Sequence, residues 1–264
     1  MNYFLLTGFS FIVGTVVGLT GIGGASLITP MLIFVFNVPA AIAVGSDIVA
    51  ATMMKAVASI SHWKQGTLDF RVVKWLAFGS VPGALLGVMI LHLIQSYGWS
   101  LDSFLLPSIG TMILFVTIAG LIQLGLATFA PNLSLLSFPN FDLETTNGKI
   151  KTVIIGLVLG CMVGLTSVSS GSLFALVLMT FFKLDSRKLV GTDITQAAIL
   201  LGFTSLGHLS LGTVAWHIVI PIWIGSVPGV LLGSKLCQLA PQRALRYLIF
   251  AILLTVSWKL IHAA

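Results

Sequence analysis

Long apolar runs, separated by short polar turns, dominate the hydrophobic pattern of this chain. The runs cover residues 4–36, 41–62, 72–94, 103–128, 151–182, 188–209, 217–237 and 243–262. Continuous runs of this length are typical of membrane helices, whereas an outer-membrane barrel shows alternating segments of about ten residues. The pattern therefore predicts an all-α polytopic membrane protein.

Two of these runs contain stretches that disfavour a continuous helix. Residues 18–30 read GLTGIGGASLITP, with glycines that each cost about 1 kcal/mol relative to alanine in a helix. A straight helix over residues 4–36 would also be about 50 Å long, which exceeds a hydrocarbon core of about 30 Å. We therefore expect residues 4–36 and 151–182 to form re-entrant hairpins, each of two half-helices of about 12–16 residues that reach the bilayer midplane.

Composition supports the membrane assignment. Apolar residues make up 57% of the chain, charged residues only 8%, and the mean hydropathy is +1.10, against about 25% charge in soluble domains. The N-terminus lacks a basic segment and a cleavage site, so we expect no removable signal peptide. Cys161 and Cys237 show no metal or disulfide spacing and are expected to be free. No soluble basic domain carries the net charge of +6, so we expect no nucleic-acid partner.

The two halves of the sequence are copies of one another. A shift of 146 residues aligns GTVVGLTGIGGASL (14–27) with GCMVGLTSVSSGSL (160–173) and GSVPGALLG (79–87) with GSVPGVLLG (225–233), without a gap. Shared apolar composition alone would not keep one register over this length, so we infer an internal duplication. The expected organisation is a first membrane repeat at 1–128, a cytoplasmic linker at 129–150 and a second membrane repeat at 151–264.

The basic residues indicate how the copies are oriented. If both broken runs enter and leave on the same face, eleven basic residues lie on one side of the membrane and only Lys259 on the other. The eleven are Lys64, Arg71, Lys74, Lys149, Lys151, Lys183, Arg187, Lys188, Lys235, Arg243 and Arg246. If every run simply crosses, the two sides receive equal numbers. The positive-inside rule therefore favours hairpins, and with three further crossings in each copy the repeats are expected to be inverted.

The breaks at the two hairpin tips are the candidate binding site. Free N–H groups at the start of a half-helix attract anions, and glycine allows a substrate to approach the backbone closely. We expect a small anion at the midplane between the two tips, Thr20, Gly21, Ile22, Gly23, Gly24, Ala25 and Ser26 in the first copy and Thr166, Ser167, Val168, Ser169, Ser170, Gly171 and Ser172 in the second. Small residues also serve close helix packing, which is the role we expect for the two GSVPG motifs.

Ionisable residues inside apolar runs are further candidates. Asp47 and Asp193 occupy equivalent positions and could carry a coupling proton or orient the tips by accepting their N–H groups. Lys55, whose counterpart is Leu201, could attract the anion or extend to the cytoplasmic face. Gln196, one turn after Asp193, completes the group of coupling or tip-orienting candidates.

Other classes of function find less support in the sequence. No Walker loop, nucleophile elbow or Cys/His cluster is present, so we expect neither a cofactor nor a metal ion. An intramembrane enzyme could use Ser169 or Ser170 with His208, but no spacing supports that pairing. An anion-selective channel could use the same two tips and stays open.

The glycine motif with its second copy, the VGSDI and VGTDI segments and the repeated GSVPG motif resemble the TauE/SafE sulfite-exporter family over nearly the whole chain. The resemblance implies a multi-pass protein of the bacterial inner membrane that exports sulfite or short organosulfonates such as sulfoacetate. The sequence departs from the family pattern at Ala25 and at the serines of the second tip, which bear on the particular anion. Coupling to protons, the direction of transport and a homo-oligomeric state are left open.

Overall fold

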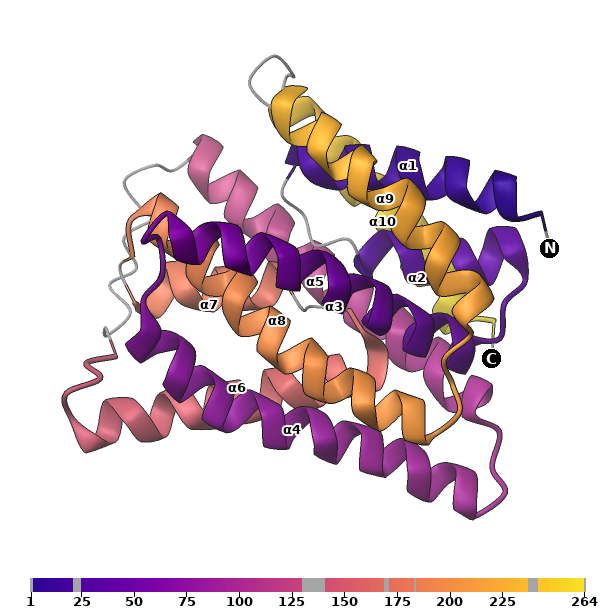
Figure 1. The fold of residues 1–264 in the computed structure, drawn as a ribbon, viewed down its shortest axis with the longest axis horizontal. Helices are drawn as coiled ribbons and strands as arrows, with labels where there is room; N and C mark the ends of the chain where they lie inside the picture. Colours follow the sequence, from indigo (N-terminus) through magenta and orange to yellow (C-terminus); the bar gives the residue numbers. More distant parts are fainter. Residues whose placement is uncertain are drawn as a thin grey trace.

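The computed structural model describes residues 2–20, 25–129, 141–168, 171–182, 184–236 and 242–263 (Figure 1). Within these residues the chain forms helices only, which confirms the predicted all-α class. They are α1 (Tyr3–Thr20), α2 (Ala25–Phe36), α3 (Ala40–Lys64), α4 (Phe70–Ser96), α5 (Leu101–Phe129), α6 (Thr146–Thr166), α7 (Ser172–Phe181), α8 (Ser186–Ser210), α9 (Trp216–Leu236) and α10 (Gln242–Ile261).

Both broken runs are interrupted where the sequence predicts. The first run ends α1 at Thr20 and begins α2 at Ala25, and the second ends α6 at Thr166 and begins α7 at Ser172. The half-helices are less equal than expected, because α1 and α6 have 18 and 21 residues whereas α2 and α7 have 12 and 10. Six helices are long and apolar enough to cross a membrane, namely α3, α4, α5, α6, α8 and α9. The first arm of the second hairpin is therefore longer than a half-span.

The repeats interlock through two closely packed helix pairs, α1 with α9 and α4 with α6. A Cβ atom on Gly83 would overlap the carbonyl oxygen of Leu157, and one on the equivalent Gly229 would overlap that of Phe11, which is equivalent to Leu157. Such pairs recur along both interfaces, at Gly79 and Gly225 and at Gly87 and Gly233. Along each interface the residue numbers of the two contacting helices increase in the same direction, so the helices of each pair run parallel. The packing role predicted for the GSVPG motifs is confirmed.

The equivalent helices α3 and α8 lie side by side near the centre of the bundle and run antiparallel. Thr52 Oγ1 lies 2.8 Å from Ser205 Oγ, and Ser59 Oγ donates to Thr195 Oγ1 over 2.9 Å. Residue numbers that rise along α3 therefore meet numbers that fall along α8. The ends of the pair are fixed by two reciprocal bonds, from Asp69 N to Thr192 Oγ1 (3.0 Å) and from Ala215 N to Ser46 Oγ (3.1 Å). Each of these bonds is the other shifted by 146 residues.

The turns that follow α3 and α8 are also copies. Gly66 and Gly212 have φ values of 67° and 70°, a left-handed conformation that glycine adopts without steric cost. His62 Nδ1 lies 2.9 Å from Thr67 Oγ1, and His208 Nδ1 lies 3.0 Å from Thr213 Oγ1. The same local sequence thus closes the same turn at opposite ends of the antiparallel pair.

Candidate functional site

Asp47 joins the two predicted hairpins. Its side chain is fully buried, and its Oδ2 accepts hydrogen bonds from Thr29 Oγ1 (2.7 Å) and from Ser167 Oγ (3.0 Å). Thr29 lies on α2 of the first hairpin, whereas Ser167 ends α6 of the second. Asp47 thus orients a predicted tip residue, Ser167, and among the described residues it does so through hydroxyl groups. Its Oδ1 has no hydrogen-bond partner among the described residues.

The end of α6 is held in a specific conformation. Ser167 has φ 60°, which is uncommon for a residue with a side chain, and its N–H donates to Val163 O. His208 supports the last turn of this helix, because its Nε2 lies 3.0 Å from Gly164 O. A carbonyl oxygen only accepts, so Nε2 carries the hydrogen and, in the neutral ring, Nδ1 accepts from Thr213. The buried His208 ring therefore fixes the tip that contacts Asp47.

Asp193, the equivalent of Asp47, lies in different surroundings. Its Oδ1 is buried and has no hydrogen-bond partner among the described residues. The positions equivalent to Thr29 and Ser167 are Ala175 and Gly21, which have no hydroxyl group. The duplication therefore repeats the carboxylate but not the side chains that would donate to it.

Lys55 lies between the two aspartates along the α3–α8 pair. It interacts electrostatically with both Asp193 and Asp47, and the Thr52–Ser205 and Ser59–Thr195 contacts flank it on either side. Lys55 is eight residues, or about 12 Å along the helix axis, from Asp47. One half-buried cation thus lies midway along two antiparallel helices, between two pairs of hydroxyl groups.

Gln196 connects this region to α4. Its Nε2 donates to Ser80 Oγ over 2.8 Å, while its buried Oε1 has no partner within the described part of the chain. Gln196 is three residues after Asp193, so both side chains lie on one face of α8. Two enclosed acceptor oxygens on this face therefore lack a donor from the described residues.

The predicted tip residues are only partly described. Gly21, Ile22, Gly23, Gly24, Ser169 and Ser170 lie outside the described residues, and the side chains of Thr20, Ala25, Ser26 and Ser172 do as well. Thr166 Oγ1 donates to Met162 O, Val168 is fully buried, and Gly171 precedes the first residue of α7.

The structure does not bring the ends of α1 and α6 together. Helix α9 runs along α3 in the same direction, as the contacts Ala215–Ser46 and Ser226–Met54 show. Leu19 lies against Gly233, beyond Ser226 in this direction, so α1 ends toward the C-terminal part of α3. Ser167 contacts Asp47, toward its N-terminal part. Helices α1 and α6, the first helix of each predicted hairpin, thus end toward opposite ends of α3. Lys55 lies between these two ends.

Several hydroxyl-bearing residues of this centre were not singled out from the sequence. They are Thr29, Thr52, Ser59, Ser80, Thr195 and Ser205. One available signal was the seven-residue spacing of Thr52 and Ser59, which places both on one face of a helix. Thr29 gave no periodic signal, because its partner Asp47 is on another helix.

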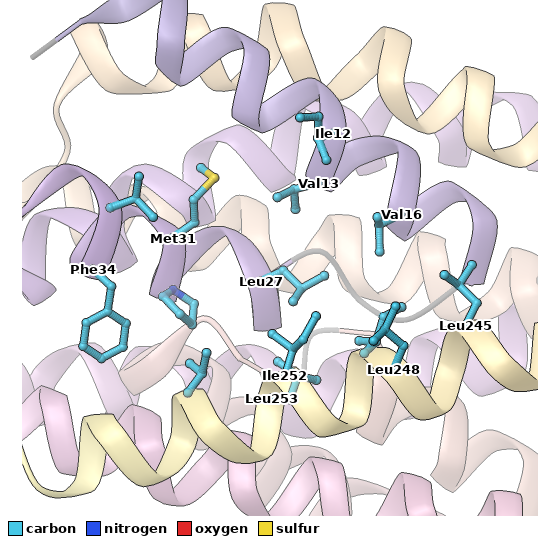
Figure 2. A pocket seen from close by; sticks show the side chains of 14 residues that line it. Ile12, Val13, Val16, Leu27, Met31, Phe34, Leu245, Leu248, Ile252 and Leu253 are labelled. Atoms are coloured by element: carbon cyan, nitrogen blue, oxygen red, sulfur yellow. The ribbon is translucent and has the colours of Figure 1, made fainter.

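The best-defined cavity, of about 330 Å³, is a different feature. It lies between α1, α2 and α10 and is lined by apolar side chains such as Val16, Met31, Phe34 and Leu253 (Figure 2). An anion there would lose its hydration without gaining donors, which is strongly unfavourable. Among the described residues no group of three His, Cys, Asp or Glu side chains could hold a metal ion.

Broken helices and ionisable side chains enclosed among membrane-length helices are typical of membrane transporters. Comparison with known proteins gives the same class. The family model described as Sulfite exporter TauE/SafE matches residues 6–260, and the chain belongs to this family.

Curated relatives carry transporter names. The Bacillus subtilis protein named probable membrane transporter protein YjnA is 38% identical over 250 residues, which cover 94% of this chain and 96% of the relative. The B. subtilis protein named probable membrane transporter protein YdhB is 23% identical over 241 residues, covering 91% and 92%. No solved structure matches the chain. The protein is therefore a membrane transporter and not an enzyme, which sets aside the pairing of Ser169 or Ser170 with His208.

Proposed function

We propose that this protein is a secondary carrier that exports a small sulfur oxyanion, sulfite or a short organosulfonate such as sulfoacetate, across the bacterial inner membrane. The observation that carries the proposal is Lys55, a half-buried cation in the α3–α8 pair whose position is flanked along the helices by two pairs of hydroxyl groups. The family description, Sulfite exporter TauE/SafE, supports the choice of cargo and of direction.

The physical requirements of such a site agree with this centre. An oxyanion that leaves water needs several convergent donors or a compensating charge, and each hydrogen bond to a charged group contributes about 1.5–3 kcal/mol. The ammonium group of Lys55 supplies the charge, and Thr52, Ser59, Thr195 and Ser205 can reorient their hydroxyl groups toward a ligand. The tip residues 20–26 and 166–172 stay part of the proposed site.

We further propose that the two repeats are inverted in the membrane. The antiparallel packing of α3 and α8 supports this orientation, because parallel repeats would place equivalent helices in the same direction. The turn before α4 also lies beside the start of α8, where Asp69 N bonds to Thr192 Oγ1. Basic residues of both repeats then share one end of the bundle, in agreement with the positive-inside rule.

Exchange of sulfite by purified protein in proteoliposomes tests the proposed function. We expect saturable counterflow, in which external sulfite accelerates release of labelled internal sulfite. Lys55→Gln should reduce this exchange at least tenfold, because the anion loses its compensating charge. The matched control is Lys64→Gln, which changes an exposed lysine at the end of the same helix and should leave exchange within about twofold.

Three results would contradict the proposal. Flux that rises linearly with concentration and shows no counterflow would instead indicate the anion channel. Uptake of a cation or of a neutral solute, with no exchange of sulfite or sulfoacetate, would exclude the anion class. Full exchange by the Lys55→Gln variant would remove Lys55 from the site.

A further inference from the structure

We infer that Asp193, and not its equivalent Asp47, takes up one proton each time a singly charged sulfonate or hydrogen sulfite binds near Lys55, so that the protein moves anion and proton together. The inference rests on the proposed function and adds the coupled ion and the residue that carries it. It is drawn from a difference between two sites that the duplication would otherwise make alike.

The two aspartates differ in their hydrogen-bond donors. Asp47 Oδ2 accepts hydrogen bonds from two hydroxyl groups, and these bonds favour the charged form of the carboxylate. In the sequence, the positions equivalent to Thr29 and Ser167 are Ala175 and Gly21, which carry no hydroxyl group. The buried Oδ1 of Asp193 receives no hydrogen bond from the described residues. Its charge therefore depends mainly on the neighbouring cation, Lys55.

Lys55 couples the anion to this carboxylate. In the empty site the positive charge of Lys55 compensates that of Asp193. When an anion binds at Lys55, the same charge must compensate a second negative group, which is costly in surroundings of low dielectric constant. Uptake of one proton by Asp193 restores the balance, so the occupied site has the same total charge as the empty one.

The same balance disfavours uncoupled movement. A site that holds the anion without the proton, or the proton without the anion, differs by one charge from both stable forms. Burying that extra charge is strongly unfavourable, so these forms are rarely populated. Coupling of one proton to each singly charged anion follows.

Among the described residues, the other titratable groups on or next to the helices that pack against α8 do not offer the same link. Asp69, whose N–H donates to Thr192 Oγ1 beside Asp193, accepts with its Oδ1 from the backbone N–H groups of Arg71 and Val72 at the start of α4. Of the helices that pack against α8, α7 has no titratable side chain, and Arg71, Lys74 and His92 of α4 are exposed. On α3, His62 bonds to Thr67, and Lys64 is exposed at the end of the helix. Lys55 is the group whose charge acts on Asp193.

Gln196 gives a second indication on the same face of α8. Its Nε2 is bonded to Ser80, and its buried Oε1 is an acceptor without a donor among the described residues. A protonated Asp193 carboxyl is a donor, and a neighbouring amide oxygen is a suitable acceptor for it. The pair can therefore stabilise the protonated form that the occupied site requires.

Accumulation of labelled methanesulfonate in proteoliposomes tests the inference. This sulfonate has one fixed charge, so any effect of pH comes from the protein. With the membrane potential clamped at zero, one coupled proton should support about tenfold accumulation on the alkaline side for each pH unit of gradient. Asp193→Asn should slow exchange at equal pH without abolishing it, and it should abolish accumulation driven by the gradient.

Two further variants keep the test decisive. Asp193→Glu should restore accumulation, which a merely structural role of the carboxyl would not predict. Asp47→Asn is the matched control at the equivalent position, and whatever its rate, it should still accumulate about tenfold per pH unit. If Asp193→Asn does not fold, retained accumulation by Asp47→Asn and by Asp193→Glu still supports the assignment, and its loss in Asp193→Glu overturns it.

The outcomes separate this inference from the proposed function. Loss of both sulfite and methanesulfonate exchange in the wild-type protein contradicts the proposed function. Sulfite exchange without methanesulfonate exchange contradicts a site for singly charged sulfonates. Methanesulfonate exchange with no response to the pH gradient, or with an unchanged response in Asp193→Asn, overturns proton coupling through Asp193. Export by such a carrier requires an outward anion gradient that exceeds the inward proton gradient.

Discussion

At the scale of single residues, the same amino acid serves different purposes in the two repeats because its neighbours differ. Asp47 is enclosed with two hydroxyl donors from separate hairpins, so it acts as a connection between them. Asp193 lacks the equivalent donors and lies under the influence of Lys55. Two hydroxyl groups that are present in Thr29 and Ser167 but absent from the equivalent Ala175 and Gly21 are the sequence difference on which the proposed separation of roles rests.

The connection at Asp47 makes a prediction for stability. Thr29→Val keeps the shape of the side chain but removes one donor from a buried carboxylate, so it should lower the free energy of unfolding by about 1–3 kcal/mol. Thermal unfolding in detergent measures the change. The control is Thr111→Val, because this exposed hydroxyl bonds only to Pro107 O of its own helix and its loss should cost less than about 0.5 kcal/mol. Equal effects of the two substitutions would argue against the connection.

At the scale of elements, the closest helix pairs are those with small residues at their contacts, and these pairs join helices of different repeats. Helices α1 and α9 belong to different repeats, as do α4 and α6, yet each pair packs with backbone in contact over several turns. Close approach of backbones replaces side-chain packing where lipid gives little hydrophobic driving force between helices. The repeats are therefore sequence units that do not fold as separate bodies.

This close pairing predicts that substitution of glycine by alanine has very different effects at different positions. Gly83→Ala and its equivalent Gly229→Ala each place a methyl group against a carbonyl oxygen of the partner helix, so both should reduce folded yield strongly. Gly202→Ala, inside α8, meets nothing within 4 Å and should be neutral or slightly stabilising. Size-exclusion profiles of the expressed variants measure the fraction of folded protein. A tolerant Gly83→Ala variant would show that the two helices can separate without loss of the fold.

At the scale of the whole molecule, the chain forms an apolar bundle whose polar groups gather along α3 and α8. Both ends of the chain lie at the right in Figure 1, together with the turns between α4 and α5 and between α8 and α9. The turn between α3 and α4 and the start of α8 lie at the opposite end. We predict that the termini lie on the outer side of the membrane and that the loops at 63–71, 129–150, 183–188 and 237–243 lie on the cytoplasmic side. The described turn between α3 and α4 and the start of α8 share one end of the bundle, as this prediction requires.

Cysteine labelling tests this orientation in cells. In a background with Cys161 and Cys237 replaced by serine, cysteines at the exposed positions Gln65 and Arg187 should react only after the membrane is permeabilised. A cysteine at Trp99, which is 73% exposed in the turn between α4 and α5, should react in intact cells. Labelling of positions 65 and 187 from opposite sides would exclude the hairpin arrangement.

The sequence by itself determined the membrane class, the duplication, the two broken runs and the packing role of the GSVPG motifs. These features depend on composition and on local spacing, because continuous apolar runs and glycine clusters act within one segment. The candidate list from the sequence also included Asp47, Lys55, Asp193 and Gln196, since ionisable or amide groups stand out among apolar neighbours.

Only the tertiary structure decided which of these residues meet. Thr29 and Ser167 are 18 and 120 residues from Asp47 in sequence, and no periodicity within one helix can show such a contact. The register of α3 against α8 placed Lys55 between the two aspartates and carried the ends of α1 and α6 past one another. Register between helices depends on the fit of whole packed surfaces, so it is set by the assembled bundle and not by any single segment.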